Sequence, residues 1–242
     1  MTSLIEILEK VNVDSPDSFY EWIDKQIFLN KNQFIVTANP EIIMLGKKNH
    51  EMSIVMEKAT IIPDGIGVVK ALKLLKKKAY RNTGIELVNH LLNYADKNSL
   101  KVFIYGAKEE VLSDFKHNCE QKWKNIKFSG LYNGYDYDKE FVAEKIKKSD
   151  SDIILVALGT PRQEVFINSF YEDLDKGICV GIGGSIDVLS GHVKRAPEWF
   201  INHNLEWLYR ITSEPKRLKR FWNGNILFVM ELLKEIISRK VL

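Results

Sequence analysis

The sequence predicts an α/β protein with a Rossmann-like, mostly parallel sheet, helices on both faces and a helical, basic and aromatic C-terminal appendage. Three observations support this prediction. Short apolar runs typical of buried strands recur along the first 195 of the 242 residues. Amphipathic helical patterns follow most of these runs, as in repeated β-α units. After residue 195 the strand pattern stops and a stretch rich in tryptophan and basic residues begins.

Each strand is predicted from a run rich in branched or aromatic apolar side chains, usually closed by glycine, asparagine or aspartate. The predicted strands are 33–39, 59–64, 101–106, 126–132, 152–159 and 177–183. Each helix is predicted from apolar residues that recur at spacings of three and four. The predicted helices of this part are 40–57, 67–78, 84–98, 108–123, 139–148 and 163–171.

The change of character near residue 195 predicts a Rossmann-like core of residues 1–195 and an appendage of residues 196–242. Three tryptophans lie among the basic residues of the appendage: Trp199, Trp207 and Trp222. An apolar helix is predicted from about Ile226. It contains Glu231 and Lys234 and falls short of the roughly 20 apolar residues that a membrane span needs, so we expect it to lie on a surface.

Composition narrows the class of protein. A content of 45% hydrophobic and 11% aromatic residues is enough for a buried core. Cys119 and Cys179 lie in a helix-like and a strand-like segment, which argues against a disulfide scaffold and favours a reducing compartment. The acidic N-terminal stretch lacks the basic start and apolar run of a signal peptide, so we expect a cytoplasmic protein.

The net charge of +3 is unevenly distributed along the chain. Residues 194–220 carry a net charge of +4, and the rest of the chain carries −1. Such a patch suits the phosphates of nucleic acid, lipid head groups or a pyrophosphate substrate. Charge alone leaves these three partners open.

Asp64 lies at the turn between a predicted strand and a predicted helix, in the sequence PDGIGVVK. An N-terminal cap explains this position, because an aspartate side chain accepts hydrogen bonds from the free N–H groups of a first turn. The chemical alternative is a carboxylate that faces a cleft, since ligands of open α/β sheets bind where the strands end.

Other strand ends also carry residues suited to a ligand. Thr37 and Asn39 end the first strand, although an asparagine in front of a proline is also a typical N-cap. Gly106 lets the backbone approach a ligand or simply turn. Gly159 precedes a predicted helix start, where Gln163 either contacts a ligand or is an ordinary first-turn residue.

The turn after the last strand has the most ligand-like sequence. A buried run enters Gly183, Gly184 and Ser185 and then a helix, which presents N–H groups and a positive helix end to a phosphate. The third glycine of the dinucleotide fingerprint is replaced by Ile186, and no acidic residue follows a second strand at the required distance. The sequence therefore disfavours NAD binding.

Two acidic triplets have the short spacing of metal-using transferases: DYD at 136–138 and DSD at 150–152. Most such triplets are solvated loops, and the second precedes its strand, at the wrong edge of the sheet. We expect no required metal ion and no other cofactor.

Five ordered motifs resemble those of the WecG/TagA/CpsF glycosyltransferases, glycosyltransferase family 26. The motifs are TANPEI, PDGIGVV, RNTGIEL, ALGTPRQE and GIGGSIDVLSGHVKRAPEW, within about residues 30–220. The resemblance implies an inverting transfer from a UDP-sugar to a polyprenyl-diphosphate-linked sugar at the inner face of the bacterial plasma membrane. The implied donor sugar is of the N-acetylmannosamine type or a related hexose, and the products are teichoic acid linkage units or other cell-surface polysaccharides.

The resemblance also implies the catalytic residues. Asp64 corresponds to the general base of the family, Thr37 and Asn39 to a pair beside the donor, and Arg81 to an arginine that helps to hold the diphosphate. The chemistry agrees, since an inverting transfer needs a carboxylate near the acceptor hydroxyl and a preorganised environment for the departing UDP. The turn 183–185, with Arg81 or the C-terminal arginines, would supply this environment for UDP without a metal ion.

Further donor contacts follow from the same resemblance. Gln163 corresponds to a glutamine that lines the pocket of the family. Tyr135 of NGYDYD and Asp187 of GGSID correspond to contacts with the base and the ribose of UDP.

The appendage gains a candidate role from this resemblance. An acceptor with a polyprenyl tail stays in the membrane, and aromatic and basic side chains on a short amphipathic segment suit docking there. The candidates for contacts with lipid phosphates or the acceptor diphosphate are Arg195, Arg210, Arg217 and Arg220. Alternatively, the appendage packs on its own core or on a sister subunit with its arginines solvated. Membrane docking and packing on a sister subunit are compatible if a soluble homo-oligomer covers the surface of the appendage that the membrane-bound form exposes.

Two other classes of function stay open. A dinucleotide-dependent oxidoreductase on the same architecture predicts stabilisation by NAD and none by UDP. A non-catalytic lipid- or nucleic-acid-binding protein predicts salt-sensitive binding that survives loss of Asp64. The leading transferase interpretation includes no nucleic-acid partner.

Overall fold

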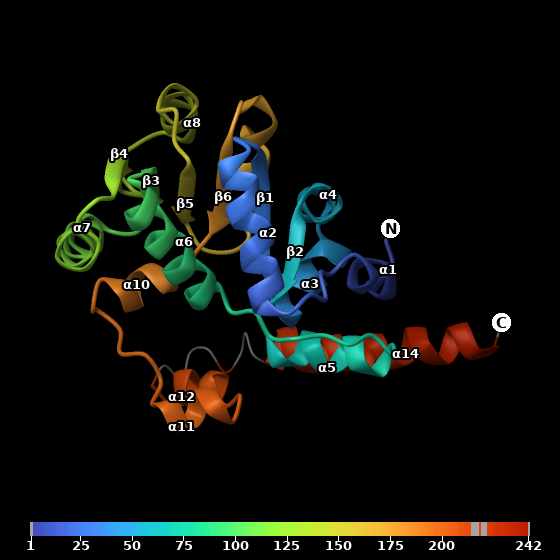
Figure 1. Cartoon of the computed structure of the whole chain (residues 1–242). Coiled ribbons are helices and arrows are strands. Elements are labelled where there is room, and N and C mark those ends of the chain that lie inside the picture. Colours follow the sequence, from blue (N-terminus) through green and yellow to red (C-terminus); the bar gives the residue numbers. More distant parts are fainter. Residues whose placement is uncertain (1, 214–217, 219–221, 242) are drawn as a thin grey trace.

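The computed structural model describes residues 2–213, 218 and 222–241, and its centre is a six-stranded parallel sheet (Figure 1). The strands are β1 (Asn32–Ala38), β2 (Thr60–Pro63), β3 (Lys101–Gly106), β4 (Lys127–Tyr132), β5 (Ile153–Ala157) and β6 (Gly177–Gly181). Their order in the sheet is β2-β1-β6-β5-β3-β4. The α/β class and all six predicted strands are confirmed, and the carboxyl ends of the strands share one edge.

Successive residues of each strand point to opposite faces, which divides the core into two layers. Phe34 of β1 and Phe103 of β3 pack with one group of helices, whereas Ile35 and Ile104 pack with the other. The first group is α1 (Leu4–Glu9), α3 (Pro40–Lys48), α4 (His50–Lys58), α5 (Ile66–Leu74), α8 (Lys139–Lys148), α9 (Arg162–Asn168) and α14 (Leu227–Val241). The second group is α2 (Pro16–Phe28), α6 (Gly84–Asn98), α7 (Glu109–Lys122) and α10 (Ser185–Leu189).

The helix predicted over 40–57 is wrong as a single element, because α3 and α4 meet at Asn49. The Asn49 backbone is extended, with φ −112° and ψ 127°, and its side chain accepts a hydrogen bond from Met52 N–H. The same residue ends α3 and caps α4. The predicted helix 67–78 also ends earlier, at Leu74, and Lys76 has a left-handed φ of 61°.

The C-terminal part contains α11 (Glu198–Asn202), α12 (Glu206–Ser213), a π-helical turn η2 (Trp222–Ile226) and α14. The predicted final helix is confirmed, and it packs on α1 and α3 with Phe228 and Leu232 buried in the first core layer. The Glu235 carboxylate accepts hydrogen bonds from the first backbone N–H groups of α1, at 3.0 Å from Leu4 and 3.0 Å from Ile5. In the described part of the chain, no helix has the length and apolar character of a membrane span.

Candidate active site

A cavity of about 150 Å³ opens at the carboxyl edge of the sheet. Seven of the residues singled out in the sequence line it: Thr37, Asn39, Asp64, Gln163, Gly183, Gly184 and Ser185. They come from the ends of β1, β2 and β6 and from the start of α9. The parallel order of the sheet therefore gathers side chains that lie up to about 150 positions apart in the sequence.

Asp64 is half-buried in the turn between β2 and α5, and it lines the cavity. Its backbone N–H donates to the Ala38 carbonyl at 3.0 Å, which fixes the turn against the end of β1. The N-cap of α5 is Gly65, and no side chain caps this helix. The N-cap interpretation of Asp64 is therefore wrong, because the helix begins one residue too late for it.

Gly65 allows this turn to lie close to the end of β1. A Cβ atom at Gly65 would come within 3.0 Å of Asn39 Cβ and of Pro40 Cδ. Asn39 itself is the N-cap of α3, and its Oδ1 accepts a hydrogen bond from Ile42 N–H at 3.0 Å. The N-cap interpretation of Asn39 is confirmed, and the same side chain lines the cavity.

Gln163 is buried, and both ends of its amide are bonded to the protein. Its Oε1 accepts a hydrogen bond from Gly183 N–H at 3.0 Å, and its Nε2 donates to Glu164 Oε1 at 2.7 Å. A Cβ atom at Gly181 would lie 2.6 Å from the Gln163 Nε2, so any larger residue at that position would displace the Gln163 amide. Gln163 thus supports the turn after β6 as well as lining the cavity.

Glu164 lies behind Gln163 and was missed in the sequence. It is buried, it also accepts a hydrogen bond from Thr160 Oγ1 at 3.1 Å, and burial raises the pKa of its carboxyl group. Its Oε2 is buried without a hydrogen-bond partner within the described residues. Its position next to Gln163 in ALGTPRQE was the available signal, but sequence alone does not show burial.

The turn 183–185 leads into α10, whose N-cap is Gly184 without a side-chain cap. Gly183 adopts a φ of 41°, a conformation that favours glycine. Asp187, in the first turn of α10, is half-buried and does not line the cavity. Its backbone carbonyl accepts a hydrogen bond from Val193 N–H at 2.9 Å, which folds the following loop onto α10.

Three other predicted residues lie along the same sheet edge but outside this cavity. Gly106 ends β3 with a φ of 121°, and a Cβ atom there would lie 2.4 Å from the Ala157 carbonyl oxygen. Gly159 follows β5 with a φ of 74° and open space around it. Tyr135 is 72% exposed in the loop after β4, where its N–H donates to Asn133 Oδ1 at 3.0 Å.

Arg81 lies beside the cavity and joins three segments. Its Nε donates to the Asp64 carbonyl at 2.8 Å, its Nη1 to Asn204 Oδ1 at 3.4 Å and its Nη2 to Glu206 Oε2 at 3.3 Å. Glu206 is buried at the start of α12 and lines the cavity. In the sequence, Glu206 is one of the acidic residues of the C-terminal part, and no local sequence pattern indicates its contact with Arg81.

The C-terminal arginines are only partly described. Arg195 Nη2 donates to Glu86 Oε1 at 3.2 Å on the surface, and Arg195 does not line the cavity. The backbone of Arg210 belongs to α12, but its side chain lies outside the described part. Arg217 and Arg220 also lie outside the described residues.

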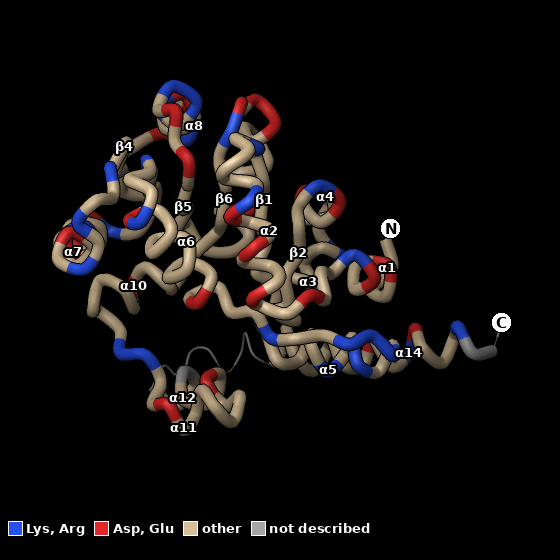
Figure 2. Tube along the Cα trace, in the orientation of Figure 1, with Lys and Arg blue, Asp and Glu red and all other residues tan. Residues whose placement is uncertain are grey.

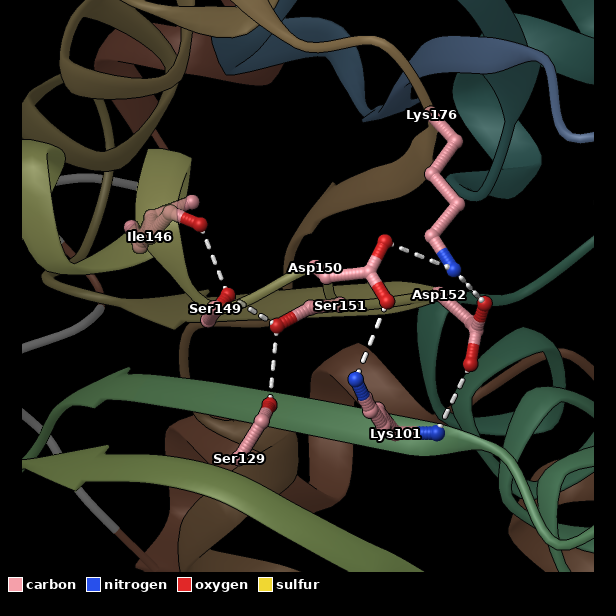
Figure 3. A network of polar contacts seen from close by, with 8 residues as sticks. All are labelled: Lys101, Ser129, Ile146, Ser149, Asp150, Ser151, Asp152 and Lys176. Carbon is pink, nitrogen blue, oxygen red and sulfur yellow. Dashed lines mark hydrogen bonds and ion pairs between the residues drawn. The ribbon is translucent and has the colours of Figure 1, made fainter.

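The DSD triplet is at the opposite edge, where strands begin (Figure 3). Asp150 accepts hydrogen bonds from Lys101 Nζ at 2.9 Å and Lys176 Nζ at 3.1 Å, and these bonds lower the pKa of its carboxyl group. Asp152 pairs with Lys176 at 2.8 Å and accepts a hydrogen bond from Lys101 N–H at 2.8 Å. Ser149 and Ser151, which are hydrogen-bonded to each other, and Ser129 extend this network. The triplet thus connects the starts of β3, β5 and β6.

The DYD triplet follows β4, and the Asp136 carboxylate accepts a hydrogen bond from Asn133 Nδ2 at 2.8 Å. Among the residues that the structure describes, no group of three His, Cys, Asp or Glu side chains is arranged to hold a metal ion. The expectation that no metal is required stays a prediction.

A cavity at the strand ends of a parallel sheet is the place where α/β proteins bind their ligands, and comparison with known proteins gives the class of this one. A model of the Glycosyl transferase WecG/TagA/CpsF family matches residues 5–241. The chain belongs to this family and is a glycosyltransferase.

Several curated relatives share the name N-acetylglucosaminyldiphosphoundecaprenol N-acetyl-beta-D-mannosaminyltransferase. The relative from Bacillus subtilis (strain 168) is 38% identical over 242 residues, which are 99% of this chain and 89% of the relative. The relative from Bacillus spizizenii is 42% identical over 193 residues, covering 79% and 75% of the two chains. The relative from Staphylococcus aureus (strain MW2) is 37% identical over 201 residues, covering 81% and 79%.

Proposed function

We propose that the protein transfers an N-acetylmannosamine-type sugar from a UDP-sugar to an N-acetylglucosamine linked to undecaprenyl diphosphate. The observation that carries this proposal is similarity over almost the whole chain to a relative whose name states that acceptor and that transferred sugar. The location of Asp64 in the cavity supports it. The family assignment does not favour an oxidoreductase or a non-catalytic protein.

In the proposed reaction, Asp64 accepts the proton of the acceptor hydroxyl as its oxygen attacks the anomeric carbon of the donor sugar. A new C–O bond forms on one face of the sugar, and the bond to the β-phosphate oxygen of UDP breaks on the other. The electron pair of the broken bond leaves with UDP. Because the acceptor oxygen attacks the face opposite UDP, the configuration at the anomeric carbon inverts. Thr37 and Asn39 line the same cavity and would position the reacting groups.

Charge develops on the departing diphosphate, and the proposed site offers groups that stabilise it. The turn 183–185 lines the cavity, and the Arg81 guanidinium is bonded to the Asp64 carbonyl. Gly183 N–H already donates to Gln163 Oε1 and Ser185 N–H to the Ile182 carbonyl, so the turn would offer the diphosphate the Gly184 N–H and the Ser185 hydroxyl. The turn and Arg81 provide donors or positive charge without a metal ion. Gly106, Tyr135, Gly159 and Asp187 are further donor contacts in this proposal, because they lie along the same edge of the sheet.

The proposal includes docking at the cytoplasmic face of the membrane, where a polyprenyl-linked acceptor is held. The C-terminal part exposes large aromatic side chains, Trp199 at 57% and Trp222 at 59%. Exposed tryptophans and basic residues next to an amphipathic helix are typical of proteins that lie on a bilayer. The C-terminal arginines would then contact lipid phosphates or the acceptor diphosphate.

The test is transfer from UDP-N-acetylmannosamine to a short-chain lipid-diphosphate-linked N-acetylglucosamine. We expect UDP to raise the melting temperature and NAD to leave it unchanged. Asp64→Asn should keep the UDP-induced shift and lose transfer, whereas Asp175→Asn, at an exposed aspartate far from the cavity, should keep both. Retained transfer in Asp64→Asn would refute the base assignment, and a shift with NAD alone would favour an oxidoreductase.

A further inference from the structure

A cluster of lysines follows the cavity-lining turn along the chain. The lysine cluster comprises Lys70 and Lys73 within α5 and Lys76, Lys77 and Lys78 just after it. No aspartate or glutamate occurs in the sequence between Asp64 and Glu86. Four of the five lysines are exposed, and so is Leu74, at 62%. The segment therefore presents concentrated positive charge around an apolar side chain.

This segment and the C-terminal segment of η2 and α14 are far apart in the sequence but approach each other at two places. At one end, Gly67 of α5 lies near Asn225, since a Cβ atom on Gly67 would be 3.7 Å from its Oδ1. At the other end, both segments meet Glu9: its carbonyl accepts a hydrogen bond from Lys77 Nζ at 2.8 Å, and its carboxylate pairs with Arg239 at 3.1 Å. Figure 2 shows basic positions along both segments.

The outer side of α14 is mostly apolar, with the exposed Lys234 among its apolar residues. Met230, Leu233 and Ile237 follow one another at helical spacing and are 62%, 47% and 62% exposed. The two acidic residues of this helix face the core instead, because Glu231 and Glu235 both pair with Lys47 of α3. The negative charge of α14 is thus directed inward, and an apolar stripe is directed outward.

We propose that α5, with its lysine cluster, and α14 form one surface that binds a bilayer of anionic phospholipids. The lysines contact the phosphates, and the apolar stripe enters the boundary between head groups and acyl chains. A second copy of this chain suits the surface less well, because a two-fold interface would bring lysine clusters together without acidic partners. This inference rests on the proposed function for its purpose, but membrane binding can be measured without it.

The surface has a consequence for catalysis. Asp64 is two residues before the start of α5, and Arg81 follows the lysine cluster by three residues. Binding of α5 to the bilayer would therefore fix the distance of the cavity from the membrane and its orientation relative to the membrane. The core itself, and not only the C-terminal part, would present the cavity to a lipid-linked acceptor.

Sedimentation of the full chain with vesicles tests the proposal. The parent should bind vesicles of phosphatidylglycerol and phosphatidylcholine, and bind pure phosphatidylcholine much more weakly. The triple variant Lys70→Gln, Lys73→Gln and Lys76→Gln should bind the anionic vesicles roughly a hundredfold more weakly, about fivefold for each lysine. The matched control changes three exposed lysines elsewhere, Lys97→Gln, Lys124→Gln and Lys127→Gln, and should bind like the parent.

Three outcomes would overturn the inference: parental binding in the α5 variant, an equal loss in the control, or a changed oligomeric state with unchanged vesicle binding. The third outcome would assign the surface to a second copy of the chain. Transfer separates this inference from the proposed function. The α5 variant should keep the parental rate with a short-chain acceptor in solution and lose rate only with acceptor embedded in vesicles. If the parent protein does not transfer the sugar, the proposed function is wrong, but the vesicle-binding result still tests this inference.

Discussion

Arg81 and Glu206 form an ion pair, with 3.3 Å between Nη2 and Oε2, that joins segments 125 residues apart. Arg81 also donates to the Asp64 carbonyl, and Glu206 opens α12 and lines the same cavity as Asp64. The side chains are 21% and 7% exposed. The pair therefore holds the C-terminal part against the edge of the candidate active site.

Glu206→Ala should lower the free energy of unfolding by about 2 kcal/mol. The Arg81 charge would lose its carboxylate partner in a partly buried position, although its bonds to Asp64 and Asn204 would remain. Urea denaturation followed by circular dichroism measures the change. The control is Glu86→Ala, which removes the partner of Arg195 from a pair whose side chains are 46% and 35% exposed. It should cost less than about 1 kcal/mol, because exposed pairs contribute little. Equal losses in both variants would contradict a special role for Glu206.

Most strands were predictable from sequence because they are nearly continuous apolar runs; the edge strand β4, KFSGLY, is the exception and is nowhere fully buried. β5 and β6 are buried along their whole length, as parallel strands covered on both faces require. The two N-terminal helices were missed despite local signals. Ser3 and Glu6 form a capping box, and Ser15 precedes Pro16 as the N-cap of α2. The break at Asn49 could not be predicted, because both flanks have helical patterns and asparagine is compatible with either a break or a helix.

The cavity was predictable as far as it depends on strand ends. Asp64, Asn39 and Gln163 all follow strands that the sequence identifies, and a parallel sheet brings such positions to one edge. Glu206 belongs to a helix outside the β-α pattern, so its approach to the cavity depends on tertiary packing. Glu164 is a charged residue whose burial depends on the packing of α9, which no local pattern reveals.

Glu164 should make stability depend on pH in a defined direction. Burial raises its folded-state pKa above the ordinary value of 4.5, so folding favours the protonated form. Its contribution is fully present below about pH 4.5 and is lost as the pH rises through the raised folded pKa. The unfolding free energy of the parent minus that of Glu164→Gln should therefore decrease as the pH rises from 4 toward 8. Urea denaturation across this range measures it.

The control for Glu164 is Glu57→Gln, at an exposed glutamate of α4. The same difference between parent and variant should change much less with pH in this case. A flat difference for Glu164→Gln as well would mean that its carboxyl group does not bind a proton on folding.

Removal of divalent metal should leave sugar transfer unchanged. The proposed site stabilises the departing diphosphate with Gly184 and Ser185 of the turn after β6 and with Arg81, and the carboxylates of Asp150 and Asp152 already bind lysines at the far edge of the sheet. The transfer rate is measured in EDTA and after addition of excess Mg²⁺. A rate that falls in EDTA and recovers with Mg²⁺ would show that the diphosphate needs a metal ion. A variant with Asp136→Asn would then test whether the DYD triplet holds it.

Phe228→Ala should destabilise the whole protein by about 3 to 5 kcal/mol, because it empties a buried position in the core layer shared by α1, α3 and α14. Met230→Ala, two residues along the same helix, is the matched control and should change stability by less than about 0.5 kcal/mol, since Met230 is 62% exposed. Thermal and urea unfolding, each followed by circular dichroism and tryptophan fluorescence, measure both variants. If α14 is part of the core, Phe228→Ala shifts the main transition with both probes. If Phe228→Ala instead produces a separate early unfolding transition and leaves the main transition unshifted, residues 196–242 unfold independently of residues 1–195.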